Sequence, residues 1–231
     1  MATNIRAPFF EIGPKSYLYG DQILELALAA DAASEKYDVD VIFTCPVVDI
    51  RRVKEATKRI HVFAPHMDPI PVGRGLADIL PESLVAAGAE GVMLNHVEKP
   101  VSFEVLAATI KRAEEVGLTT IVCADSMADA SKIAGLHPDI IVAEPSELIG
   151  TGVSVGPEYV EAAMQSVKGV DADILVLTAA GIANGNDVYN TIIAGADATG
   201  SSSGVAKAAD RAAMVDEMIA AARKAWDERH A

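Results

Sequence analysis

The sequence contains few aromatic residues, few basic residues and almost no cysteine. Aromatic side chains make up 5% of its 231 residues, although 51% of the residues are hydrophobic. The interior must therefore be built mainly from Ala, Val, Ile and Leu, which is typical of helices packed on a parallel sheet. A chain of this length can bury the core of one large α/β domain.

Positive charge is scarce. There are 19 Lys and Arg against 33 Asp and Glu, which gives a net charge of −14. Proteins that bind nucleic acid or anionic membranes need a basic face, so the composition predicts neither partner. An anionic substrate would have to be held by groups within the binding site, such as backbone amides at the start of a helix.

The two cysteines, Cys45 and Cys123, each lie inside or at the end of an apolar strand-like run. We expect buried free thiols in a reducing cytoplasm, and neither a disulfide nor a catalytic thiol. No apolar run approaches membrane-spanning length, and residues 1–8 lack the apolar core of a signal peptide. Neither a His/Cys metal-ligand spacing nor a dinucleotide-binding glycine motif is present, so we expect no metal and no cofactor.

Strand-like and helical patterns alternate along the whole chain. The strand-like runs cover residues 9–12, 40–44, 60–64, 91–94, 119–124, 140–143, 174–177 and 197–200. The clearest helical patterns cover residues 21–36, 102–116, 126–135, 157–167, 186–194 and 208–229, with weaker ones at 50–57 and 81–87. Eight strand–helix units without a long linker favour a closed (β/α)8 barrel in one α/β domain, residues 1–231, with a doubly wound sheet as the alternative.

The segment 141–152, which reads I-V-A-E-P-S-E-L-I-G-T-G, carries the strongest functional signal. Glu144 stands at the carboxyl end of a strand-like run, and Gly150 and Gly152 form the end of the loop that follows. In barrels, catalytic groups lie at the carboxyl ends of the strands, so this pattern suits a general base beneath a lid. A carboxylate that only caps the next helix is the alternative.

Two further strand ends carry candidate catalytic side chains. Lys15 follows the first strand and can hold a phosphoryl or carbonyl oxygen as a point charge. His96 follows the fourth strand and can polarise a carbonyl group. Taken singly, each is better explained as a solvated lysine or a structural histidine; the common location at strand ends favours the functional interpretation.

The loops after the seventh and eighth strands are rich in small residues. They read A-A-G-I, which includes Gly181, and S-S-S-G, which includes Ser203 and Gly204. Barrels often bind phosphate at these two loops through backbone N–H groups, and small residues let the backbone approach the anion. We therefore expect a phosphate site here.

Several phrases resemble those of the triosephosphate isomerase family, in its compact archaeal-type branch. They are I-x-P-K-S-Y, V-F-A-x-H-x-D-P-I, L-P-E-S, L-N-H-x-E, A-E-E-V-G-L, A-E-P-x-E-L-I-G-T-G and G-V-A-K-A. The resemblance implies a TIM barrel in which Glu144 abstracts a proton beside the substrate carbonyl, His96 polarises that carbonyl and Lys15 balances charge. It also implies a supporting role for Glu98, a homodimer or homotetramer, and a cytoplasmic enzyme of glycolysis and gluconeogenesis.

Three positions depart from the family pattern. Gly13 replaces the usual Asn two residues before the lysine, Leu76 replaces a Thr that reaches into the neighbouring subunit, and Val97 replaces the Ser after the histidine. We therefore expect a pocket floor that is roomier and less polar than usual. The leading hypothesis is isomerisation of dihydroxyacetone phosphate and glyceraldehyde 3-phosphate. The alternatives are an isomerase of another short sugar phosphate, such as an erythrulose phosphate, and a catalytically inactive phosphosugar-binding protein.

Overall fold

Eight short strands form the centre of the protein, in a computed structural model that describes residues 3–149, 151 and 153–231. All pair in parallel with their sequence neighbours, and β8 returns to β1, so the sheet closes on itself. The strands are β1 Phe9–Ile12, β2 Asp40–Thr44, β3 His61–Ala64, β4 Gly91–Leu94, β5 Thr119–Ala124, β6 Ile140–Ala143, β7 Leu175–Thr178 and β8 Ala198–Ser201. The predicted single-domain (β/α)8 barrel is confirmed.

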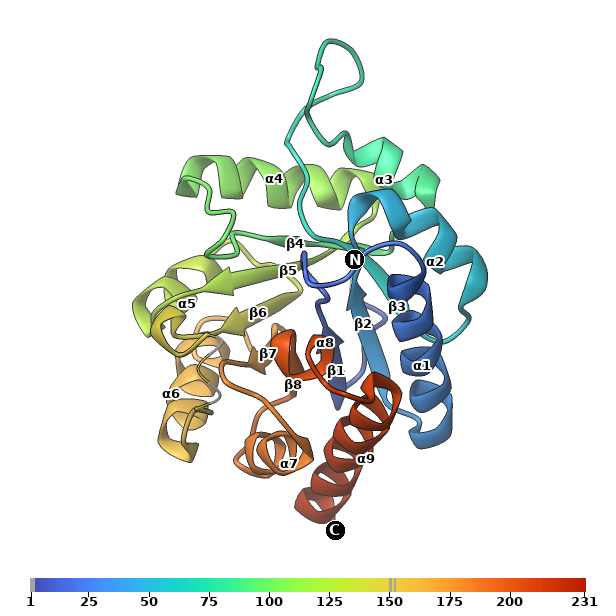
Figure 1. Cartoon of the computed structure of the whole chain (residues 1–231). Helices are drawn as coiled ribbons and strands as arrows, with labels where there is room; N and C mark the ends of the chain where they lie inside the picture. The colour runs from blue at the N-terminus through green and yellow to red at the C-terminus, as the bar shows by residue number, and fades with distance from the viewer. Residues whose placement is uncertain (1–2, 150, 152) are drawn as a thin grey trace.

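Helices surround the barrel as an outer layer (Figure 1). They are α1 Asp21–Tyr37, α2 Ile50–Ala56, α3 Pro81–Ala87, α4 Phe103–Val116, α5 Met127–Ala134, α6 Pro157–Lys168, α7 Gly185–Ile193, α8 Ser203–Ala206 and α9 Arg211–His230. Short 3-10 turns occupy Val47–Asp49 and Ser146–Leu148. Several helices begin where the sequence supplies a cap: Ser102 Oγ accepts a hydrogen bond from the N–H of Val105, and Asp210 Oδ1 accepts one from Ala213. Among the described residues, no helix is both long and apolar enough to cross a membrane.

Two hydrophobic cores result from the alternation of side chains along each strand. One lies between the strands and the surrounding helices, and the other fills the barrel interior. The interior core includes Phe9, Ile42, Phe63, Ile121 and Ile140. These apolar side chains fill the interior of the barrel, so a ligand could enter only at its mouth.

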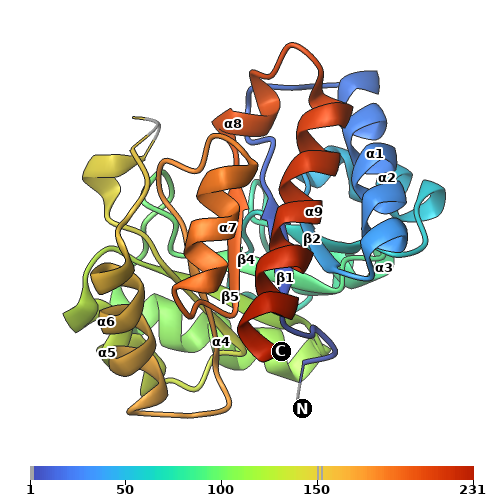
Figure 2. The same ribbon diagram turned by 90° about the horizontal axis from the view of Figure 1, so that it is seen from below.

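Near the carboxyl end of the chain, one predicted helix start is wrong and one short helix was not predicted. The helix predicted at residues 208–229 begins at Arg211, and a separate short helix, α8, precedes it. Asp210 ends the intervening turn by capping the long helix. Figure 2 shows α8 at one end of the barrel, with the carboxyl terminus of the chain toward the other end. The carboxyl ends of the strands therefore meet near α8.

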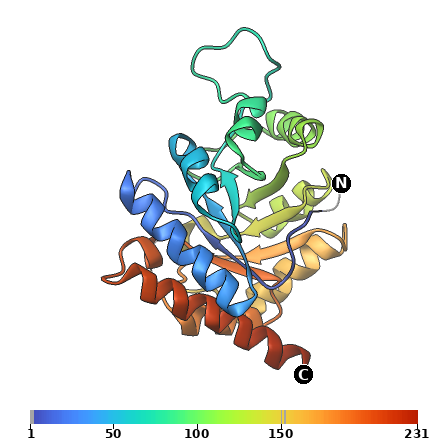
Figure 3. The ribbon, with the colours of Figure 1, turned by 90° about the vertical axis from the view of Figure 1, so that its right-hand side faces the viewer.

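The loop between β3 and α3 extends away from the barrel (Figures 1 and 3). Leu76 in this loop is fully exposed, and Val72 is exposed as well. These apolar side chains have no cover within the described part of the chain.

Candidate active site

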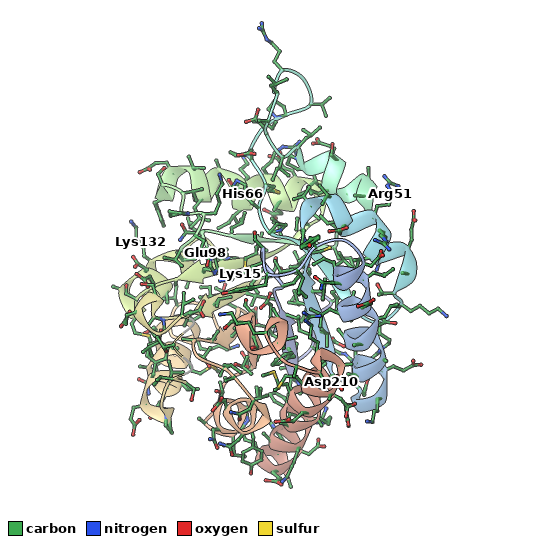
Figure 4. The ribbon with its side chains drawn as sticks, viewed as in Figure 1. Lys15, Arg51, His66, Glu98, Lys132 and Asp210 are labelled. Atoms are coloured by element: carbon green, nitrogen blue, oxygen red, sulfur yellow. The ribbon has the colours of Figure 1, made fainter. Side chains whose placement is uncertain are left out.

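A cavity of about 630 Å³ opens at the carboxyl ends of the strands. Lys15, His96 and Glu144, predicted from three different strand ends, all line it. In Figure 4 Lys15 and Glu98 lie together near the barrel centre, whereas labelled residues such as Arg51 and Lys132 lie at the periphery. The barrel thus brings the three candidate catalytic side chains to one site.

Glu144 is the candidate base among the carboxylates that line this cavity. It directly follows β6, and its backbone N–H donates a hydrogen bond to the carbonyl of Ala124 at 3.1 Å. Burial is the main cause that raises the pKa of Glu144 above its usual value; Lys15 opposes the rise and Asp125 adds to it. A carboxylate that has lost much of its water is a stronger base, so Glu144 is suited to take a proton from carbon.

The loop that carries His96 is held by Asn95. Asn95 has a left-handed backbone (φ 58°), and its side chain donates to the carbonyl of Cys123 and accepts from the N–H of Val101. His96 itself accepts a hydrogen bond at Nδ1 from the backbone N–H of Glu98, at 3.1 Å. An Nδ1 that accepts carries no proton, so the neutral ring has its hydrogen on Nε2.

The electrostatic surroundings favour the same neutral form of His96. Burial, and next the positive charge of Lys15, lower the pKa of His96 below its usual value of 6.5. A neutral imidazole with Nε2–H can donate a hydrogen bond to a carbonyl oxygen without carrying full charge. His96 is thus prepared as an electrophile rather than as a cationic acid.

Lys15 reaches the cavity from an uncommon backbone conformation. Its φ is 46°, in the left-handed region, where a non-glycine residue is disfavoured by roughly 1–2 kcal/mol. Its Nζ forms an ion pair with Oε1 of Glu98 at 3.1 Å, and the lysine side chain is 22% exposed. Glu98, predicted as a supporting residue, orients the ammonium group.

The two loops predicted to bind phosphate also line the cavity. Gly181, Ser203 and Gly204 face it, and Ser201 Oγ ties the loops together by donating to the carbonyl of Ile182 at 2.8 Å. Ser203 begins α8, whose first N–H groups have no acceptor inside the helix. These amides are available for an anion. The predicted phosphate contacts Gly150 and Gly152 fall outside the described residues.

Gly181 is the point where the segment after β6 meets the loop after β7. Its φ is +68°. A Cβ added there would overlap the carbonyl group of Val153 and would lie 2.8 Å from the backbone nitrogen of Val153. Only glycine permits this close approach between the two backbones.

The prediction of a less polar pocket floor is wrong, because the sequence reading overlooked Glu11. Glu11 lies on β1 inside the barrel, lines the cavity and accepts a hydrogen bond from Thr44 Oγ1 at 2.5 Å. A Cβ added to Gly13 would stand 3.0 Å from Glu11 Oε1. The carboxyl group of Glu11 therefore occupies part of the space that an Asn side chain at residue 13 would fill.

The other two departures lie away from this cavity. Leu76 is on the protruding loop, and Val97, 46% exposed, lines a smaller neighbouring cavity. Neither changes the pocket floor within this chain. Of the three positions, only Gly13 lines the main cavity.

The two thiols are buried and free, as predicted. Cys123 lines the cavity, but burial raises its pKa well above the usual value, and burial raises that of Cys45 to about 12. Both thiols stay protonated and are poor nucleophiles. No cluster of three or more His, Cys, Asp or Glu side chains within residues 3–149, 151 and 153–231 is arranged as a metal site.

Comparison with known proteins identifies the family. The family model described as "Triosephosphate isomerase" matches residues 15–221. The chain belongs to the triosephosphate isomerase family. It is 33% identical to the triosephosphate isomerase of Sulfolobus acidocaldarius, over 97% of this chain and 99% of that protein. It is 36% identical to the triosephosphate isomerase of Methanothermus fervidus, over 87% of this chain and 91% of that protein.

Membership of the triosephosphate isomerase family confirms the predicted enzyme class, an aldose–ketose isomerase. The triosephosphate isomerase of Methanocaldococcus jannaschii is also 36% identical, over 87% of this chain. All three relatives are matched over more than nine-tenths of their own length.

Proposed function

We propose that the protein interconverts dihydroxyacetone phosphate and glyceraldehyde 3-phosphate through an enediol. Glu144 removes a proton from the carbon beside the carbonyl and returns it to the neighbouring carbon. His96 donates a hydrogen bond from Nε2 to the carbonyl oxygen, and Lys15 balances the negative charge on the substrate. The same division of roles is the established one in triosephosphate isomerases.

The observation that carries this proposal is the pairing of Glu144 with neutral His96 in one cavity. An isomerase needs a base for carbon and a donor for oxygen, each in the correct protonation state. Here burial raises the pKa of the carboxyl group and lowers that of the imidazole, so the two groups are tuned in opposite directions. A protein that only binds phosphosugars would gain nothing from a carboxylate beside an anionic ligand, which disfavours the inactive alternative.

The phosphate group of the substrate is held by backbone amides. The candidates are the N–H groups of the loop at Gly181 and of the first turn of α8 at Ser203 and Gly204, together with the lid at Gly150 and Gly152. Their use fits the charge of the protein, because a net charge of −14 does not attract an anion from a distance and leaves its binding to groups within the site.

A homodimer or homotetramer is part of the same proposal. The exposed Leu76 and Val72 on the protruding loop support it, since isolated apolar side chains on an extended loop gain stability when a second copy covers them. Sedimentation of the wild type and of Leu76→Glu tests this: the wild type should sediment as an oligomer and the variant should shift toward monomer. A cytoplasmic location is proposed from the two buried free thiols.

A coupled assay tests the proposed reaction. Purified protein is supplied with glyceraldehyde 3-phosphate, and the dihydroxyacetone phosphate formed is reduced by a dehydrogenase that consumes NADH. Steady turnover well above the protein-free rate supports the proposal. A rate equal to the protein-free background would overturn it.

A further inference from the structure

The mechanism proposed above does not use the buried carboxyl group of Glu11, which lines the cavity. Glu11 is 8% exposed, and the part that remains accessible faces the cavity. On β1 it stands one inward-facing position above Phe9, which belongs to the apolar core of the barrel. The carboxyl group therefore forms the floor of the site.

Glycines on both sides make room for this side chain. Glu11 pairs in register with Gly200 on β8, where an added Cβ would stand 2.9 Å from the Cβ of Glu11 and 3.0 Å from its Oε2. An added Cβ at Gly13 would stand 3.0 Å from Oε1 and 3.3 Å from Ser202 Oγ. Because residue 13 has no side chain, nothing from that position separates the carboxyl group from the cavity.

The two carboxyl oxygens have different partners. Oε1 accepts the hydrogen bond from Thr44 Oγ1, at 2.5 Å. Oε2 has no hydrogen-bond partner among the described residues and is not among the fully enclosed polar atoms. A buried carboxyl oxygen without a protein partner is costly unless a ligand or water completes it. Oε2 is thus available to a ligand that reaches the floor.

The oxygens of a triose phosphate are already assigned. In the mechanism proposed above, backbone amides hold its phosphate and Lys15 balances its charge. His96 serves the carbonyl oxygen and the adjacent hydroxyl, which exchange places in the reaction, and Glu144 faces the reacting carbons. Because the Glu11 carboxyl is an additional polar group at the floor of the cavity, its use in binding requires an additional polar group on the substrate. Glu144 also lies close enough to raise the pKa of Glu11, so a second anionic group on the ligand would be repelled. A neutral hydroxyl is the group that fits.

We propose, as an extension of the isomerase function above, that Glu11 and Thr44 bind an additional hydroxyl group of the substrate, and that the enzyme isomerises four-carbon ketose phosphates. The cavity of about 630 Å³ does not limit the ligand to three carbons. In the reaction Glu144 moves one proton between adjacent carbons and the carbonyl and hydroxyl groups exchange places, so no oxidant or reductant is needed. The extra hydroxymethyl group takes no part in the chemistry and supplies binding only.

The test compares specificity constants for glyceraldehyde 3-phosphate and for erythrulose phosphates. The wild type should isomerise both. In Glu11→Met, which keeps a linear side chain but loses the acceptor, kcat/KM for the four-carbon substrates should fall at least roughly tenfold, with the three-carbon value within about threefold. Glu11→Gln keeps an acceptor for Thr44, so its kcat/KM for the four-carbon substrates should lie between the values of the wild type and of Glu11→Met. Equal losses on both substrates, or no loss on either, would overturn the role of Glu11.

A matched control is Glu90→Gln. Glu90 is a half-buried carboxylate just before β4, at the opposite end of the barrel, where it pairs with His61 and Lys54. This variant should leave the ratio of the two specificity constants unchanged, even where it lowers stability. A changed ratio would mean that any lost carboxylate alters specificity, and would overturn the inference.

Binding to the wild type provides a second measurement that needs no variant. Erythritol 4-phosphate and glycerol 3-phosphate cannot react, and they differ by one hydroxymethyl unit. Calorimetry should give a Kd at least roughly tenfold lower for the four-carbon ligand. Equal or weaker binding, together with no four-carbon turnover, would refute the hydroxyl site but leave triose phosphate isomerisation standing. Failure to turn over any sugar phosphate would instead refute the proposed function.

Discussion

The carboxyl group of Glu11 occupies the space into which a side chain at Gly13 would extend. A Cβ added to Gly13 would stand 3.0 Å from Glu11 Oε1, and that oxygen is already held by Thr44. The family's usual Asn at residue 13 and the glutamate at residue 11 therefore compete for one volume.

We predict that Gly13→Asn and Glu11→Gly are coupled. Gly13→Asn alone should lower the free energy of unfolding by ~1–3 kcal/mol, because it overpacks a buried site next to a carboxyl group. Adding Glu11→Gly should recover most of that loss. Urea unfolding of the wild type, both single variants and the double variant gives the interaction energy. Strictly additive effects would show that the two side chains do not share the space.

The same overlap changes the expected effect of restoring the family pattern at residues 13 and 76. Gly13→Asn with Leu76→Thr should shift the preference toward the three-carbon substrate only when Glu11 is also removed. Specificity constants on three- and four-carbon substrates check this for the double variant, for Glu11→Gly alone and for the triple variant. The triple variant should exceed the shift that Glu11→Gly alone produces. A full shift in the double variant would mean that Glu11 moves aside without cost.

Stability should depend on pH through Glu11. Burial raises the pKa of Glu11 from its usual 4.5 to about 7. The folded state then binds more protons than the unfolded state between these values, so the contribution is complete below pH 4.5 and is lost as the pH rises through 7. The loss is up to ~3 kcal/mol. Urea unfolding from pH 5 to 8 should show the wild type losing stability relative to Glu11→Gln; parallel curves would contradict this.

Gly181→Ala should disturb the lid. An added methyl group would overlap the Val153 carbonyl, so the lid segment must move, and kcat/KM should fall ~10–100-fold. Gly117→Ala is the control, because Gly117 has a similar φ of +79° but open space around it. Both variants carry a left-handed strain of roughly 1–2 kcal/mol. Comparable kinetics in the two variants would mean that contact with the lid at Gly181 is unimportant.

His96→Gln should lower kcat by ~10²-fold or more and leave KM nearly unchanged. The reason is that a donor to the carbonyl oxygen acts mainly as negative charge develops there. Steady-state kinetics separate the two constants. An increase confined to KM would place His96 in ground-state binding.

The fold could be predicted from the sequence because its signals are local and repeated. Each strand is a short apolar run and each long helix has its own amphipathic pattern, so the eight units were found with small errors at their ends. The short helix α8 was missed because Ser203 and Gly204 are small residues without a helical pattern, and its conformation depends on packing against the loop after β7. Tertiary contacts therefore determine the conformation of that segment.

The candidate site was predictable where one residue stood at a strand end. Lys15, His96 and Glu144 met that condition, and all three line the cavity. Glu11 did not, because it lies within a strand whose other residues are apolar. A lone carboxylate in such a strand is itself a signal, but its meaning depends on Gly200 and Thr44, which are distant in the sequence. The closed barrel is what brings them together.

The most direct test of the account follows hydrogen exchange at the substrate carbon. Triose phosphate is incubated in D₂O with the wild type, Glu144→Gln or Glu161→Gln, and deuterium incorporation is read by NMR. Glu161 is an exposed carboxylate on α6 outside the cavity, so its variant is the matched control. The account predicts rapid incorporation with the wild type and the control, and a rate lower by at least ~10²–10⁴-fold with Glu144→Gln, because the general base is lost. Incorporation by Glu144→Gln within threefold of the wild type would contradict the central claim.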